Sequence, residues 1–288
     1  MNEDFTDFIE TAGLLNYDPE TISKIYQKNP KRLFKRLWQT LIPIFAYIFS
    51  VGWDKLTGKL KVETQARFRA KQLTNLLVDL GPPFVKAGQA LSTRPDIIPA
   101  VLLEELSELQ DQLPGFDGNK AMELIEEDLN SKIDEIFLSI DKEPISAASL
   151  GQVHKAKLKS GEKVAVKIQR PGLREQITLD LYIVRNIAIW FKNNIGIIRS
   201  DLVALIDELG KRIFEEMDYI NEANNAEKFK NLHSGNNKIA VPKIYREATS
   251  RRVLTMEWID GTKLTNIEAV KSLGIDPNEM VEIGVSCS

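Results

Sequence analysis

The feature that most constrains the fold is a change of period near residue 143, where apolar residues stop recurring at helical spacing and begin to alternate. The segments PISAASLGQVHKAKL and KVAVKIQ both alternate, and residues 159–162 between them, with one glycine, are typical of a short hairpin turn. We therefore predict three successive strands. Further strands are expected over residues 239–245 and 252–257, with residues 248–250 as the turn.

Helical patterns occupy most of the remaining chain. Ahead of the strands, helices are expected over residues 62–80, 84–93, 99–113 and 117–129, and behind them over 173–194, 201–233 and 267 to the C-terminus. A chain of 288 residues suits about two domains or one two-lobed domain. The pattern predicts an α+β fold, in which an α-helical extension precedes an antiparallel sheet with its own helices.

Charge and cysteine content exclude several classes of function. The 38 basic and 41 acidic side chains leave a net charge of −3, which does not favour a nucleic-acid partner, because such binding relies on positive charge. One cysteine and two histidines form neither an internal disulfide nor a usual zinc site. Residues 1–23 carry acids but no Lys or Arg, the opposite of a signal peptide. We expect a reducing compartment and no bound zinc.

Residues 28–53 combine a basic cluster with an apolar run. Five basic residues between Lys28 and Arg36 precede LIPIFAYIFSVGW, residues 41–53, which carries no charge. As a helix this run reaches about 20 Å, short of the roughly 30 Å hydrocarbon core of a bilayer. Two interpretations remain open. One is a monotopic membrane anchor with interfacial aromatic residues and basic residues near anionic lipid; the other is a buried core helix with a solvated basic flank.

Two side chains in this framework suggest chemistry. Lys167 lies in the Val-Ala-Val-Lys strand, where its charge could bind the phosphates of ATP, although a solvated surface lysine is the commoner role. Glu222, expected late in the helix over 201–233, could pair with Lys167. Asp218, four residues earlier, would share its helix face, so that a cation is needed to offset the two charges unless they form a solvated acidic stripe.

In their order, these motifs resemble the UbiB/AarF-type atypical kinases, the ABC-one or aDCK-like family of prenyl-lipid biology. Residues 86–89, KAGQ, look like the K-x-G-Q motif of the helical extension, and residues 146–154, SAASLGQVH, resemble the alanine-rich nucleotide loop. Lys167 matches the strand lysine of the family. Residues 216–218 resemble its E-x-D motif, and Glu222 resembles the helix glutamate that follows.

The resemblance covers roughly residues 60–288 and implies a protein-kinase-like N-terminal lobe that binds ATP with magnesium. It implies cofactor-binding roles for Ala147, Ala148, Ser149, Val153, Lys167, Glu222, Glu257 and Ile259. Backbone groups around the last two would pair with the adenine edge. In the family, the K-x-G-Q helix lies across the cleft, which implies regulatory roles for Lys86, Gln89, Glu216 and Asp218. It favours ATPase or lipid-kinase activity over protein phosphorylation.

The catalytic loop H-x-D-x-H-P-G-N and the D-F-G of the family do not occur in the sequence. We therefore expect no catalytic residue and no magnesium ligand in this chain, with the C-terminal catalytic lobe absent. Asp276 and Pro277 are expected to begin a helix. The expected segments are an N-terminal region (1–60), the K-x-G-Q extension (61–140), the nucleotide-binding lobe (141–265) and the start of a truncated lobe (266–288).

The resulting expectation is a membrane-associated atypical kinase or ATPase that supports prenyl-lipid or quinone metabolism. Its expected partners are a nucleotide and a membrane lipid, prenyl-lipid or quinone, with membrane-surface contact through residues 28–53. A bacterial source and the cytoplasmic face of a membrane are expected, and a resemblance to the photosynthetic branch of the family suggests a cyanobacterium. The alternative is a non-catalytic, membrane-associated regulatory or interaction module.

Overall fold

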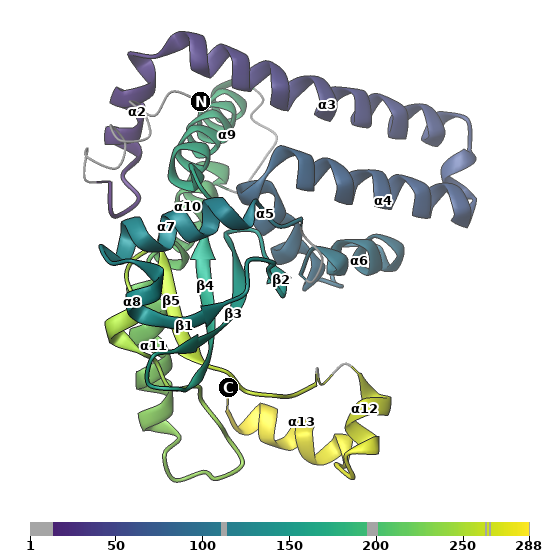
Figure 1. Ribbon diagram of the computed structural model, residues 1–288. Helices are drawn as coiled ribbons and strands as arrows, with labels where there is room; N and C mark the ends of the chain where they lie inside the picture. Colours follow the sequence, from purple (N-terminus) through teal and green to yellow (C-terminus); the bar gives the residue numbers. More distant parts are fainter. Residues whose placement is uncertain (1–13, 111–113, 195–200, 263, 265, 288) are drawn as a thin grey trace. The chain divides into compact units, whose positions relative to one another are not determined.

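The computed structural model describes residues 14–110, 114–194, 201–262, 264 and 266–287, and Figure 1 shows its helices and strands. The chain divides into two compact units, each assembled from separate stretches of sequence. The first unit comprises Met1–Ala121, Pro144–Val153 and Gln169–Met217. The second unit comprises Met122–Glu143, His154–Ile168 and Asp218–Ser288.

The first unit is helical. It contains α2 (Pro19–Gln27), α3 (Pro30–Leu56), α4 (Glu63–Leu80), α5 (Pro82–Ser92), α6 (Ala100–Ser107), α9 (Leu173–Asn194) and α10 (Leu202–Glu216), with short 3-10 turns η1 (Lys59–Lys61) and η2 (Glu108–Gln110). The helices predicted over 62–80, 84–93 and 173–194 are confirmed as α4, α5 and α9. A core of Ile22, Tyr26, Ile177 and Phe214 holds α2, α9 and α10 together.

The second unit contains most of the sheet. The strands are β1 (Phe137–Ile140), β2 (Ser146–Ala147), β3 (Gly151–Leu158), β4 (Lys163–Gln169) and β5 (Val253–Glu257), in the order β1-β3-β4-β5, with β2 paired to β3. The observed pairs β1–β3, β2–β3 and β4–β5 are antiparallel. Gly161, with a φ of +104°, allows the predicted hairpin turn between β3 and β4. The three successive strands are therefore confirmed.

The other elements of the second unit are helices that precede, separate or follow these strands along the chain. They are α7 (Gly118–Leu129), which begins in the first unit, α8 (Ile133–Ile136), α11 (Tyr219–Leu232), α12 (Ile267–Ser272) and α13 (Pro277–Ser286), with the 3-10 turn η3 (Arg246–Ala248). Asp276 caps α13 by accepting a hydrogen bond from the N–H of Asn278, as predicted. A helix-rich chain with a small antiparallel sheet is the α+β kinase-like lobe that the sequence predicts.

Two sequence predictions about these elements were wrong, and one strand was missed. The single helix expected over 201–233 is two helices, because Asp218 adopts an extended conformation and caps α11. The strand expected over 239–245 is reduced to an isolated bridge between Ile244 and Met256, since Pro242 has no N–H for a ladder. Strand β1 was not predicted, because Phe137–Ile140 directly follows the short α8 and does not alternate clearly.

Candidate functional site

Strand β4 positions the lysine of the candidate nucleotide site. Val164, Val166 and Ile168 point to the buried face, so Lys167 lies on the other face and is only partly exposed. Lys167 stands opposite Leu254 in the register with β5, and Leu254 packs against Tyr219 and other residues of α11. Helix α11 therefore covers the face of the sheet that carries Lys167.

Lys167 and Glu222 form a two-pronged ion pair. The ammonium Nζ of Lys167 lies 2.8 Å from Oε1 and 2.7 Å from Oε2 of Glu222. The same ammonium lies 4.7 Å from the centre of the Tyr219 ring, a cation–π distance. Both charged side chains remain partly exposed. The arrangement fixes the lysine in place while leaving its positive charge accessible to an anion.

Glu222 reaches this position from the first turn of α11, which differs from the position expected for it late in a long helix. Asp218 precedes the helix and caps it, with Oδ1 accepting from the N–H of Ile220 at 3.0 Å. Its other oxygen lies 3.8 Å from Nε of Arg251. Asp218 therefore does not share a helix face with Glu222 as predicted, because it lies outside α11 in an extended conformation. Its carboxylate is stabilised by the helix N-terminus and needs no metal for this.

The residues predicted to bind the adenine edge, Glu257 and Ile259, lie at the end of β5 and in the segment that follows it. The N–H of Glu257 donates to the carbonyl of Lys243 at 2.8 Å, and its carboxylate accepts from the N–H of Lys243 at 3.0 Å. The N–H of Trp258 donates to the carbonyl of Lys163 at 3.1 Å. These bonds tie the segment to the chain on both sides, so its backbone is held in a defined conformation.

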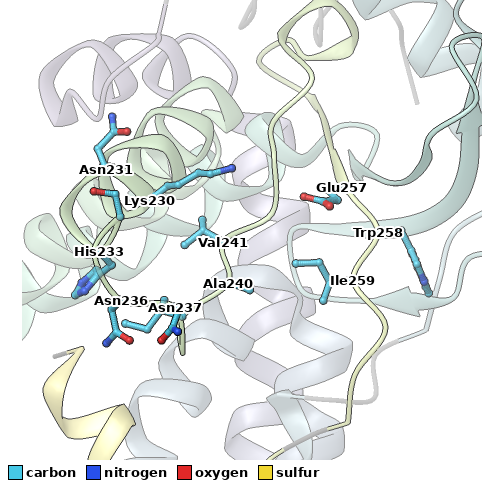
Figure 2. Close-up of a pocket in the computed structure, with 12 residues that line it drawn as sticks. Lys230, Asn231, His233, Asn236, Asn237, Ala240, Val241, Glu257, Trp258 and Ile259 are labelled. Carbon is cyan, nitrogen blue, oxygen red and sulfur yellow. The ribbon is translucent and has the colours of Figure 1, made fainter.

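A pocket of about 690 Å³ adjoins this segment (Figure 2). One wall is Glu257, Trp258 and Ile259, and the other runs from the end of α11 to Val241. The polar residues of that second wall, among them Lys230, His233 and Asn236, were not predicted as site residues; the only signal is the polar run that follows α11. Lys167 and Glu222 do not line this pocket. Of the two parts of the predicted nucleotide site in this unit, the pocket therefore adjoins only the one at Glu257 and Ile259.

In the first unit, α5 positions the K-x-G-Q residues. The ammonium of Lys86 forms an ion pair with the carboxylate of Glu216 at the end of α10. The side-chain amide of Gln89 donates to the carbonyl of Leu109 at 2.8 Å. Gly88 packs so closely that a β-carbon there would lie 2.5 Å from Cδ1 of Leu109. Helix α5 is therefore fixed against both α10 and η2.

The alanine-rich loop also belongs to the first unit. Ala148 donates its N–H to the carbonyl of Gly151 at 2.7 Å, which closes a tight turn between β2 and β3. Ser149 is buried, Ala148 is exposed, and Ala147 and Val153 are partly exposed. The structure thus brings together Lys86 and Glu216 in one unit and Lys167 and Glu222 in the other.

Magnesium in proteins is bound mainly by carboxylate oxygens. In the part of the chain that the structure describes, no group of three His, Cys, Asp or Glu side chains is arranged to hold a metal. The described residues therefore do not fit a magnesium ion.

Helix α3 decides between the two interpretations of residues 28–53. Eight of its large apolar residues are exposed: the side chains of Phe49 and Leu56 are 72% and 85% accessible, and Phe34, Trp38, Ile42, Phe45, Ile48 and Trp53 are also exposed. Its buried residues are instead polar, Thr40 at 2% and Asp54 at 3%. The buried core helix is therefore wrong. We call these eight exposed residues the outer face of α3.

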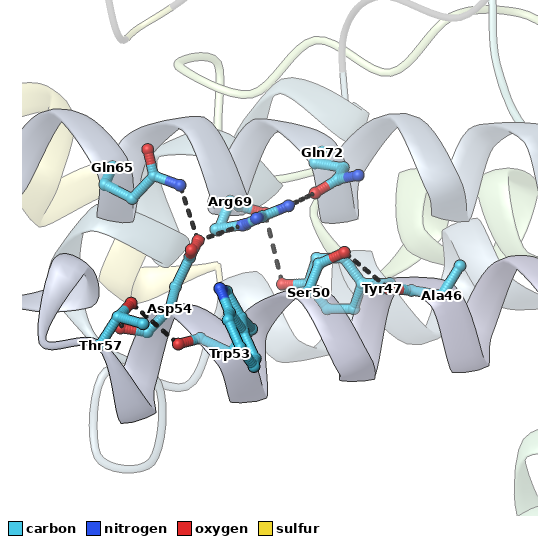
Figure 3. Close-up of polar contacts among 9 residues, drawn as sticks. All are labelled: Ala46, Tyr47, Ser50, Trp53, Asp54, Thr57, Gln65, Arg69 and Gln72. Carbon is cyan, nitrogen blue, oxygen red and sulfur yellow. Dashed lines mark hydrogen bonds and ion pairs between the residues drawn. The ribbon is translucent and has the colours of Figure 1, made fainter.

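Polar contacts hold the inner side of α3. Figure 3 shows Oδ2 of Asp54 accepting from Nε of Arg69 at 2.6 Å and from the side-chain amide of Gln65 at 2.6 Å, both on α4. Nearer its start, Arg36 donates twice to the buried carboxylate of Asp180 on α9, at 2.6 and 2.8 Å. Burial raises the pKa of Asp180 despite this pairing. The inner side of α3 therefore combines these paired polar groups with half-buried apolar residues such as Leu37, Leu41 and Ile44, while the outer face stays exposed.

The length and hydropathy of the helices determine whether any of them could cross a membrane. Across the part of the chain that the structure describes, no helix is both long enough and apolar enough to pass through a bilayer.

A small antiparallel sheet whose strand lysine pairs with a helix glutamate defines a kinase-like nucleotide lobe. Comparison with protein families gives the particular family. The model for the ABC1 atypical kinase-like domain matches residues 108–288. The chain belongs to this family, in agreement with the resemblance drawn from its motifs.

The chain is also similar to individual known proteins. An uncharacterized protein of Synechocystis sp. is 51% identical over 272 residues, covering 94% of this chain and 40% of its own length. The chloroplastic protein ACTIVITY OF BC1 COMPLEX KINASE 3 of Arabidopsis thaliana is 42% identical over 273 residues, covering 94% and 38%. The Mycobacterium tuberculosis protein Rv3197, solved with erythromycin, is 32% identical with a TM-score of 0.49, covering 74% of this chain and 53% of its own.

The chain spans less than half the length of these two curated relatives. Their sources, a cyanobacterium and a plant chloroplast, fit the expected bacterial origin or a plastid one.

Proposed function

We propose that this chain is a nucleotide-binding lobe of the ABC1 family that binds ATP through Lys167. The observation that carries the proposal is the pairing of Lys167 with Glu222, at 2.7 and 2.8 Å, on the face of the sheet covered by α11. A lysine held in this way offers a fixed charge to the α- and β-phosphates, which is the role of the equivalent pair in kinases. Because its ammonium is partly exposed, a phosphate has access to it.

The remaining nucleotide contacts are proposed from the family motifs. Backbone groups of Glu257 and Ile259 would bind the adenine edge, and the alanine-rich loop, with Ala147, Ala148, Ser149 and Val153, would contact the phosphates. Alanine carries a β-carbon that glycine lacks, so this loop wraps phosphates less freely than a glycine-rich loop. ATP supplies the transferable phosphoryl group when bound. The residues of this chain bind and orient it without turning it over, because the sequence holds no catalytic-loop Asp.

Titration with a fluorescent ATP analogue tests this proposal. We expect weak binding by residues 1–288, reduced at least tenfold in Lys167→Ala, because a charge-assisted contact to phosphate contributes about 1.5–3 kcal/mol. Lys157→Ala, an exposed lysine on β3, is the matched control and should bind as the wild type does. Equal affinity in both variants would contradict the role of Lys167. ATP hydrolysis by residues 1–288 that Lys167→Ala abolishes would overturn the absence of turnover.

We further propose that α3 lies in the surface of a membrane. An outer face of aromatic and aliphatic side chains, held outward by polar contacts on the inner side, suits the boundary between head groups and acyl chains. Lys31 and Lys35 are exposed near one end of the helix, and Lys55 and Lys59 near the other. These lysines would attract anionic lipid head groups, so we commit to an anionic bilayer as the partner.

Flotation with liposomes tests the role of α3. The triple variant Phe45→Ser, Phe49→Ser and Trp53→Ser should lose at least tenfold in binding to vesicles that contain phosphatidylglycerol, while keeping its far-ultraviolet spectrum and melting temperature. Leu205→Ser, an exposed apolar residue of α10, is the control for a general loss of hydrophobicity. Flotation of the triple variant at the wild-type level would remove the membrane role of this helix.

The second candidate function is a non-catalytic, membrane-associated regulatory or interaction module. It is favoured by the outer face of α3, an exposed apolar surface that a partner or a membrane could cover. The two candidates separate in the same experiments: vesicle binding with no nucleotide binding supports the module, and binding of both supports the kinase-like lobe. A prenyl-lipid or quinone partner, the regulatory role of the K-x-G-Q and E-x-D residues, and the four predicted segments stay predictions.

A further inference from the structure

A separate piece of chain lies against the alanine-rich loop in the first unit. This piece is Pro114–Phe116, which we call the strap; it follows η2 by a few residues and precedes α7. Gly115 approaches the loop so closely that a β-carbon there would lie 3.1 Å from both Oε1 of Gln152 and Cγ of Pro144. Such distances leave no room between the strap and the loop.

Gln152 joins the strap to the start of β3. Its side chain is fully buried, and its Oε1 accepts from the N–H of Phe116 at 2.8 Å. Its Nε2 donates to the carbonyl of the same residue at 3.2 Å. One side-chain amide thus satisfies both backbone groups of Phe116. A carboxylate in its place would accept the first bond but could not donate the second.

Arg170, directly after β4, joins the strap to the loop itself. Its Nη2 donates to the carbonyl of Pro114 at 2.6 Å, while Nε and Nη2 both donate to the carbonyl of Ala148, at 3.1 and 3.0 Å. Its backbone N–H donates to the carbonyl of Leu150 at 3.0 Å. A guanidinium, with its planar set of donors, is better suited than a flexible ammonium to hold two carbonyls from separate segments.

These bonds pair both backbone groups of Ala148. The N–H of Ala148 is already used within the turn by the carbonyl of Gly151, and Arg170 takes the carbonyl. The strap in turn lies five residues after Leu109, the residue that receives the bond from Gln89 of the K-x-G-Q helix. A short stretch of sequence therefore separates the K-x-G-Q contact from the contact with the alanine-rich loop.

We propose that Arg170 and Gln152 are positioning residues, which hold the alanine-rich loop in one conformation through the strap and thereby set its affinity for nucleotide phosphates. The link to affinity rests on the proposed nucleotide binding. A loop that is already ordered loses less conformational freedom when a ligand binds, so releasing it weakens binding.

Hydrogen exchange and nucleotide titration on the 288-residue chain test this proposal. Arg170→Lys keeps the positive charge but loses the planar guanidinium that contacts both carbonyls. Gln152→Glu keeps the size of the side chain but loses the N–H donor to the carbonyl of Phe116. Arg212→Lys, at an exposed ion pair with Glu208, is the control. We expect the amides of residues 147–151 to exchange roughly tenfold faster in both variants. The reason is that the free energy of local opening falls by about the contribution of one hydrogen bond. Exchange in α9 should not change, which separates local release from unfolding.

The binding result should be specific to phosphates. Affinity for the ATP analogue should fall about three- to tenfold in both variants, while competition by adenosine, which lacks phosphates, stays at the wild-type level. Unchanged exchange of the loop in both variants would overturn the proposal, and so would faster exchange with equal or tighter ATP binding. If the wild type binds no nucleotide, the proposed function fails, and the exchange rates alone then decide whether the strap holds the loop.

Discussion

Strand β4 and helix α3 obey opposite rules of burial. In β4 the apolar Val164, Val166 and Ile168 are buried and the lysine between them reaches outward. In α3 the only fully buried residues are the polar Thr40 and Asp54, and eight large aromatic and aliphatic residues are exposed. The strand completes its hydrophobic core within the chain. The helix packs part of its apolar surface only halfway, and leaves its outer face for another phase or another molecule.

The largest effect on stability is expected at the ion pair that joins α3 to α9. Arg36→Met leaves the carboxylate of Asp180 buried without its partner, which should lower the free energy of unfolding by about 3–5 kcal/mol in urea denaturation. The double variant Arg36→Met with Asp180→Leu removes the unpaired charge and should recover much of that loss. A single variant as stable as the wild type would show that α3 is not held through this pair.

A matched pair of truncations compares the two regions directly. Ile168→Ala in β4 should cost about 2–5 kcal/mol of stability, because it opens a cavity in a packed core. Phe49→Ala in α3 removes a larger side chain and should cost no more than about 0.5 kcal/mol, since that ring is mostly exposed. Urea denaturation measures both. Similar losses would mean that the outer face of α3 packs within the protein in solution.

Charge at the start of α3 should matter for lipid and not for folding. Lys31→Gln with Lys35→Gln should weaken binding to anionic vesicles by about 2 kcal/mol, since each lysine near such a surface contributes about 1 kcal/mol. Sedimentation with anionic and with neutral vesicles measures the difference. The unfolding midpoint should stay constant. An equal loss of binding on neutral vesicles would argue against an electrostatic contribution.

The smallest effect concerns His154 on β3. Burial lowers the pKa of its imidazole, whose Nδ1 lies 2.8 Å from the carbonyl of Asp141. In the unfolded chain this histidine has its ordinary pKa of about 6.5, so it takes up a proton at a higher pH than in the folded chain. The free energy of unfolding should therefore fall as the pH decreases below about 6.5. Thermal melts between about pH 7.5 and about pH 5.5 should show this slope, and His154→Asn should reduce it. An unchanged slope would mean that other groups cause it.

Local patterns were sufficient to predict much of this molecule. Alternation and the glycine of the turn predicted the β3–β4 hairpin, and periodicity predicted α4, α5 and α9. The break between α10 and α11 was missed, because the sequence pattern continues through Met217 and Asp218 while the capping carboxylate ends it. At the candidate site, the strand lysine and its helix glutamate were named from sequence. The polar wall of the adjoining pocket was not, since nothing in its composition sets it apart from a surface loop.

The orientation of α3 could not be predicted, for a different reason. Pro43 and scattered polar residues blur its helical periodicity, so the pattern leaves open which side faces the protein. That side is chosen by partners far along the chain, such as Asp180, which lies 144 residues from Arg36. Long-range ion pairs of this kind leave no local trace in a sequence.

The outer face of α3 has a consequence for handling the purified chain. A row of exposed aromatic residues on a rigid helix is a self-complementary surface, and two copies can cover each other's rows in water. Without lipid, the chain should therefore associate as its concentration rises, and mild detergent should return it to single molecules. The need for detergent during extraction and the tendency of the protein to associate in water thus both follow from the exposed outer face of one helix.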